Sequence, residues 1–91
     1  MKSSPDPHGY QRLFRSLEFI AKECREAGAS AAARELERAM AFFGTGSASE
    51  YLGEASIALA VAARTEPLPP SVRAFASAVE SEIRSGWNRL P

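Results

Sequence analysis

The sequence predicts an all-α protein, an antiparallel four-helix bundle built from two αα-hairpins. Three observations support this fold. Apolar residues recur at helical spacing in four separate segments. Short breaks that contain glycine or proline, the residues that end helices, separate these segments. The third segment has no polar side chain between residues 57 and 63, so other helices must surround it.

Length and composition favour a single helical domain over residues 1–91, with residues 1–6 as a flexible N-terminal lead-in. The chain has 17 alanines, which form helices readily but bury little apolar area each. We therefore expect close helix packing, and we expect self-association to bury further surface.

The first helix is predicted over residues 7–27. Asp6 is a suitable cap, Pro7 fits the first helical position, and Gly28 suits the left-handed conformation that ends a helix. Cys24 lies on the apolar stripe, where a thiol is a small, inert core residue. The stripe consists of Tyr10, Leu13, Phe14, Leu17, Ile20, Ala21, Cys24 and Ala27.

Phe19 points away from this stripe, about 180° around the helix from Tyr10. It lies in a charged face made of Arg12, Arg15, Glu23 and Glu26. An apolar centre with a charged rim is typical of a protein interface. Phe19, Arg12 and Arg15 are therefore one part of the candidate interface.

The second helix is predicted to begin with Ser30 as its cap and to end at Gly44. Its stripe consists of Ala29, Ala32, Ala33, Leu36, Ala39, Met40 and Phe43. The tight turn before it predicts antiparallel packing on the first helix. Phe42 lies off the stripe and is predicted to cover the next loop, and residues 44–47, GTGS, form a linker.

The third helix is predicted to start at a capping box formed by Ser47 and Glu50. Its large apolar face consists of Tyr51, Leu52, Ala55, Leu59 and Ala62, and small residues line a second face. Ile57 and Val61 share the third face with charged residues, where we expect partial exposure. They are the second part of the candidate interface.

The fourth helix is predicted to start at Pro70 or Ser71, after the rigid segment 66–70, EPLPP. Its stripe consists of Val72, Phe75, Ala76, Val79, Ile83, Gly86, Trp87 and Leu90. Because Trp87 continues the stripe, it is predicted to close one end of the core.

Charge and motifs argue against several functions. The 11 basic and 11 acidic residues balance, so we expect neither a nucleic acid nor a membrane as partner. One histidine and one cysteine offer no triad or metal set, which predicts no enzyme activity, no cofactor and no metal. The lone cysteine and a polar start without an apolar signal region predict a cytoplasmic location. The alanine- and arginine-rich composition is typical of a bacterial protein.

Two functions fit this pattern. The first is a non-catalytic protein-interaction module, a homodimer or a small accessory subunit. Its predicted partner is a protein, a second copy of the same chain. The alternative is a small-molecule or lipid-binding bundle, with a cavity between the first, third and fourth helices lined by Phe14, Leu59, Phe75 and Trp87. A helix-turn-helix DNA-binding regulator is disfavoured, because net charge is zero and no helix face is basic.

Overall fold

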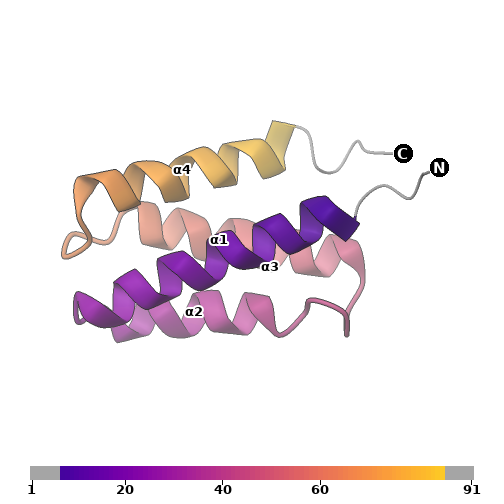
Figure 1. Ribbon diagram of the computed structural model, residues 1–91, viewed down its shortest axis with the longest axis horizontal. Coiled ribbons are helices and arrows are strands. Elements are labelled where there is room, and N and C mark those ends of the chain that lie inside the picture. Colours follow the sequence, from indigo (N-terminus) through magenta and orange to yellow (C-terminus); the bar gives the residue numbers. More distant parts are fainter. Residues whose placement is uncertain (1–6, 86–91) are drawn as a thin grey trace.

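The computed structural model describes the backbone of residues 7–85 and the side chains of residues 9–85. Figure 1 shows four helices, α1 (Pro7–Glu26), α2 (Ser30–Met40), α3 (Ala48–Ala63) and α4 (Pro70–Ser85), with successive helices running in opposite directions. No strand occurs in this part of the chain. The predicted all-α four-helix bundle is therefore confirmed, whereas the predicted lead-in at residues 1–6 lies outside the described residues.

The helices do not pack equally on one another. α1 packs closely on α2, α3 packs closely on α4, and α2 joins the two pairs by packing on α3. By contrast, α1 meets α4 and α3 at only a few points. No described helix has both the length and the apolar character needed to cross a membrane.

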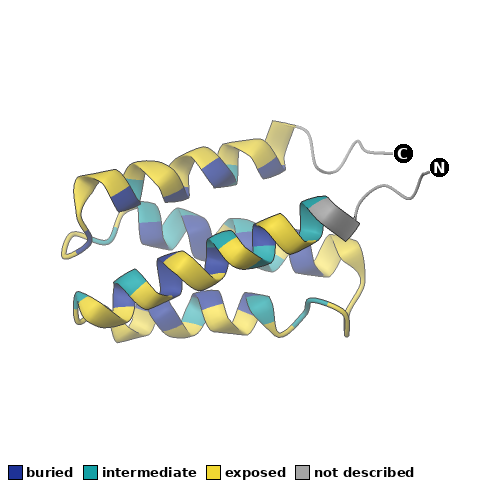
Figure 2. Ribbon diagram, in the orientation of Figure 1, coloured by how far each residue is buried: buried dark blue, intermediate teal, exposed yellow. Residues whose placement is uncertain are grey.

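The core lies between the four helices, and Figure 2 shows the buried positions as stripes on each of them. Its largest fully buried side chains are Leu13, Leu17, Ile20, Leu36, Leu59, Leu68 and Cys24. Alanines fill much of the remaining contact area on α2 and α3, where Ala33, Ala55 and Ala62 have no exposed surface. The core is therefore built from leucines that pack against small residues, as the composition predicts.

The turn between α1 and α2 is fixed by backbone hydrogen bonds around Gly28. Gly28 has a φ of 83° and donates to the carbonyl of Arg25 at 3.2 Å, and Ala29 donates to the carbonyl of Cys24 at 2.7 Å. These two bonds form a Schellman motif. The prediction that Ser30 caps α2 is wrong, because Ala29 occupies the cap position and Ser30 is already helical. Because the turn is so short, Ala29 both completes the Schellman motif at the end of α1 and occupies the cap position of α2.

The end of α2 is tighter than predicted. The α-helix stops at Met40, and Phe42 and Phe43 follow in a turn with bonds to the carbonyls three residues earlier. Gly44 then takes a φ of 84°. Phe42 covers the next loop as predicted, since a Cβ added to Gly46 would lie 2.8 Å from its ring.

Helix α3 begins with the predicted capping box. The Ser47 hydroxyl accepts from the backbone N–H of Glu50, and the Glu50 carboxylate accepts from the backbone N–H of Ser47, both at 3.1 Å. Two backbone donors that the helix leaves unpaired are thereby satisfied.

The segment between α3 and α4 contributes a core residue that the sequence analysis missed. Leu68 lies between prolines, yet its side chain is only 1% exposed. The Arg73 guanidinium of α4 donates to the Leu68 carbonyl at 3.2 Å. The signal for its burial was present in the sequence, because Leu68 is the only large apolar residue in this proline-rich connection. It was missed because it belongs to no helical stripe.

Phe75 does not lie in the core, although its spacing placed it on the stripe of α4. Its side chain is 40% exposed. The reason is that α1, the helix on that side of α4, touches α4 at few points and leaves the ring uncovered. Trp87 and Leu90, which continue the predicted stripe, lie outside the described residues.

Candidate functional site

Two exposed phenylalanines meet where α1 and α4 approach each other. Phe19 of α1 is 46% exposed and Phe75 of α4 is 40% exposed. Their ring centroids are 5.9 Å apart at an interplanar angle of 79°, an edge-to-face contact. The pair spans the α1–α4 seam, the shallow groove between the two helices lined by Arg12, Arg15, Ser16, Phe19 and Phe75. The sequence left the exposure of Phe19 open, and its aromatic partner Phe75 was not predicted.

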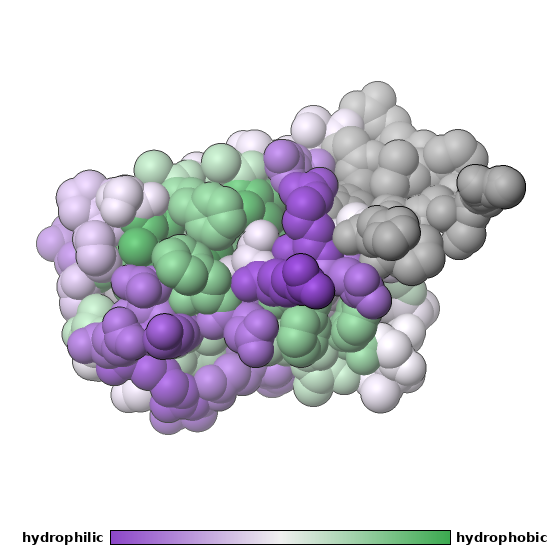
Figure 3. All heavy atoms as spheres, viewed as in Figure 1, coloured by the Kyte–Doolittle hydropathy of each residue, from purple (hydrophilic) through white to green (hydrophobic). Residues whose placement is uncertain are grey.

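Charged side chains border this aromatic pair. Arg12 forms an ion pair with Glu82 of α4 at 3.4 Å, and both side chains remain more than half exposed. Arg15 lies one helical turn before Phe19 and is also exposed. Figure 3 shows the resulting surface, an apolar area over α1 and α4 with hydrophilic side chains around it. Phe19, Arg12 and Arg15 therefore lie together, as predicted.

The other two predicted interface residues lie on a different face. Ile57 of α3 is 58% exposed and Val61 is half-buried. Ile57 lies about 160° around α3 from the fully buried Leu59, so it points away from the core. In Figure 1, α3 runs behind α1. The structure thus divides the predicted interface residues between two faces.

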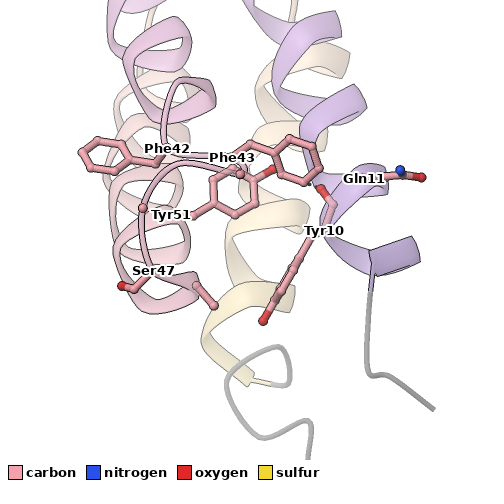
Figure 4. A pocket seen from close by; sticks show the side chains of 9 residues that line it. Tyr10, Gln11, Phe42, Phe43, Ser47 and Tyr51 are labelled. Atoms are coloured by element: carbon pink, nitrogen blue, oxygen red, sulfur yellow. Dashed lines mark hydrogen bonds between the residues drawn. The ribbon is translucent and has the colours of Figure 1, made fainter. Parts of the chain in front are cut away.

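A second site, an aromatic cleft, lies where the beginning of α1 meets the loop between α2 and α3. It encloses about 300 Å³ and is lined mainly by aromatic rings, those of Tyr10, Phe42, Phe43 and Tyr51. Figure 4 shows the rings of Phe43 and Tyr51 together, with Tyr10 beside them and Gln11 and Ser47 at the edges. The Phe43 and Tyr51 centroids are 5.4 Å apart, and those of Tyr10 and Tyr51 are 6.0 Å apart.

Tyr51 is the fixed point of the aromatic cleft. Its hydroxyl donates to the backbone carbonyl of Tyr10 at 3.0 Å, which ties the start of α3 to the start of α1. Burial raises the pKa of the Tyr51 phenol above its ordinary value, so it stays protonated at neutral pH and keeps donating. By helical spacing, Tyr10, Phe43 and Tyr51 belong to the stripes of three different helices and Phe42 to none, whereas the up-and-down chain path brings all four to one end of the bundle.

The predicted ligand-cavity residues do not gather in one place. Leu59 is fully buried in the core. Phe14 packs on Phe43 with centroids 5.1 Å apart, whereas Phe75 contacts Phe19 in the α1–α4 seam. The fourth residue, Trp87, lies outside the described residues. Leu59, Phe14 and Phe75 therefore lie in three separate places of the described chain.

Cys24 is buried in the core, as predicted. Burial, together with the neighbouring Glu23 carboxylate, raises the pKa of its thiol, which keeps the thiolate scarce at neutral pH. Within residues 9–85, no three histidine, cysteine or acidic side chains lie close enough together to hold a metal ion.

Two hollows of the described surface, the α1–α4 seam and the aromatic cleft, are lined by aromatic side chains. Comparison of the chain with protein-family models, with curated proteins and with solved structures finds no match. The function is accordingly argued from these two sites.

Proposed function

We propose that this chain is a non-catalytic protein-interaction module that associates with itself through the α1–α4 seam. The observation that carries the proposal is the exposed pair of Phe19 and Phe75 at the loosely packed junction of α1 and α4. We further propose a cytoplasmic, bacterial setting, which rests on the single cysteine and the composition.

The energetics of the aromatic pair support a contact surface. An edge-to-face pair adds about 0.5–1.5 kcal/mol beyond the burial of its area, so the two rings gain something from each other. Each ring nevertheless leaves two-fifths or more of its surface in water. A partner that covered both rings would gain the remaining burial, at about 25 cal/mol per Å².

The chemistry of the bordering groups also supports binding rather than catalysis. Phenyl rings have no proton to transfer, and Arg12 and Arg15 contribute guanidinium groups, which donate hydrogen bonds and do not act as general bases. Aromatic residues and arginine are the types most enriched at interaction hot spots. The α1–α4 seam is therefore suited to hold a partner surface and not to move protons.

The solution mass of the purified chain, measured by light scattering over a range of concentrations, tests this proposal. We expect a dimer that Phe19→Glu converts to a monomer while far-UV circular dichroism stays unchanged. Ile57→Glu is the matched control, because it places the same charge at an exposed apolar position on the other face. A wild-type chain that is monomeric at every concentration, or a dimer that only Ile57→Glu disrupts, would contradict the proposal.

The aromatic cleft supports a second function, the binding of a small apolar or aromatic molecule. Its volume of about 300 Å³ falls at the lower end of the range of ligand pockets, and its rings come from three different segments. Gln11 and Ser47 at the edges offer polar groups for orientation. This function is independent of self-association, since the cleft and the α1–α4 seam share no lining residue.

Fluorescence of 1-anilinonaphthalene-8-sulfonate, an aromatic probe, tests this second function. We expect an increase in emission with wild-type protein and a smaller one with Phe42→Ala, which removes a lining ring that is only half-buried. Ile57→Glu serves as the control, because Ile57 does not line the cleft, and should leave the emission unchanged. Equal emission from wild type and Phe42→Ala would exclude the cleft as the probe site.

A further inference from the structure

The outer face of α1 has charges of opposite sign on the two sides of Phe19. Arg15 and Glu23 each lie four residues from Phe19 along the chain, and Arg12 and Glu26 each lie seven residues from it. All four lie within about 40° of Phe19 around the helix axis. The face is therefore basic toward the beginning of α1, apolar at its centre and acidic toward its end.

Such a face is complementary to a second copy of itself turned end to end. When two α1 helices pack antiparallel about a two-fold axis at Phe19, residues at equal distances on either side of Phe19 face each other. Arg15 of one copy then meets Glu23 of the second copy, and Arg12 meets Glu26. A parallel arrangement would instead place arginine against arginine and glutamate against glutamate.

Most of these charges have no ion-pair partner within the described part of their own chain. Arg15, Glu23 and Glu26 take part in no ion pair there, and Arg15 and Glu26 are exposed while Glu23 is half-buried. Arg12 does pair with Glu82, but across 3.4 Å and with its side chain 63% exposed. A second copy would supply the missing opposite charges at the rim of an apolar centre.

We infer that the partner of the α1–α4 seam is a second copy of this chain, docked antiparallel with Phe19 of both copies on the two-fold axis. The inference rests on the proposed self-association and adds its geometry. The rings of Phe19 and Phe75 from both copies form the apolar centre, and pairs from residue 15 to residue 23 and from residue 12 to residue 26 flank it on both sides.

Charge reversal tests this arrangement. In a two-fold dimer, Arg15→Glu turns two attractive pairs into repulsive ones, and Glu23→Arg does the same from the other side. We expect each variant alone to raise the dimer dissociation constant about tenfold or more at low salt. Mixing the two variants should yield a heterodimer, because Glu at position 15 then meets Arg at position 23 and the second pair remains native. Its dissociation constant should return to within about threefold of wild type, since both flanking contacts are attractive again.

Arg34→Glu is the control, because it makes the same charge change at an exposed position of α2. It should associate like wild type. Circular dichroism of every variant checks that the helices remain, and added salt should reduce the differences between variants.

Three outcomes would overturn the inference. If Phe19→Glu disrupts the dimer but the charge reversals do not, the α1–α4 seam self-associates in another arrangement and only the proposed function stands. If each charge-reversal variant alone associates as tightly as wild type and their mixture associates more tightly than wild type, the helices pack parallel. A wild-type chain that stays monomeric removes both the proposed self-association and this geometry.

Discussion

The two sides of α1 differ in how they meet their neighbours. On its core side, the side chains of Leu13 and Leu17 are fully buried, and Arg25 holds Glu37 of α2 through two hydrogen bonds of 2.8 and 2.6 Å. Toward α4, the helices touch at few points and the aromatic pair remains in water. One side of the helix therefore belongs to the core, whereas the other leaves two aromatic rings partly in water.

Connectivity explains much of this difference. A turn of three residues, 27–29, joins α1 to α2 and holds their axes close together. By contrast, α1 and α4 lie far apart in the sequence, and no short connection forces them together. The groove between them is lined by Phe19, Phe75 and two arginines.

The largest expected effect on stability distinguishes Leu17 from Phe19, which lie two residues apart on opposite sides of α1. Leu17→Ala should lower the free energy of unfolding by about 2–5 kcal/mol, because it leaves a cavity in the core. Phe19→Ala should change it by less than about 1 kcal/mol, since that ring is already half in water. Urea unfolding at low protein concentration measures both. Equal losses would mean that the two sides of α1 contribute equally to the free energy of unfolding.

A smaller effect is expected where α1 meets α3. Tyr51→Phe removes the hydrogen bond to the Tyr10 carbonyl and should cost about 1 kcal/mol in unfolding free energy. Tyr10→Phe is the matched control, because the Tyr10 hydroxyl forms no hydrogen bond with residues 9–85. If the two variants unfold at the same urea concentration, the hydrogen bond from Tyr51 of α3 to Tyr10 of α1 adds nothing to stability.

The pair of Arg25 and Glu37 should make stability depend on pH. Hydrogen bonds from Arg25 hold the pKa of the Glu37 carboxyl below its usual range. A lowered carboxyl pKa stabilises the folded state above the unfolded pKa, and this stabilisation is lost as pH falls through the folded pKa. The stability difference between wild type and Glu37→Gln, measured by urea unfolding, should therefore shrink between about pH 6 and pH 3.

The reciprocal variant Arg25→Gln controls for this assignment, because it removes the same two hydrogen bonds from the other partner. The stability difference between wild type and Arg25→Gln should shrink over the same pH range. A difference that stays constant with pH would show that the pair does not couple to folding.

The smallest effect is expected for the exposed ion pair across the α1–α4 seam. Glu82→Gln should change the free energy of unfolding by no more than about 0.5 kcal/mol, because the pair between Arg12 and Glu82 is exposed to solvent. Thermal unfolding of the two proteins side by side measures it. A loss above about 1 kcal/mol would mean that this side of α1 is held more firmly than its exposure indicates.

The sequence alone determined the helices and most of their ends. The Schellman glycine Gly28 and the capping box of Ser47 and Glu50 act through backbone groups only a few residues away, so local sequence is enough to predict them. The period of the apolar residues likewise predicted which residues share a face. Leu13, Leu17 and the other buried residues of α1 follow from that period.

Tertiary structure alone decided what covers each face. The helical period placed Phe75 on the core stripe of α4, but the distance to α1 leaves it exposed beside Phe19. Nor could the period show that Ile57 lies on a different face of the bundle, or that Tyr10 and Tyr51 meet at one end of it. The physical reason is that a helix repeats its own geometry along the chain, whereas its coverage depends on how far away and at what angle its neighbours pack.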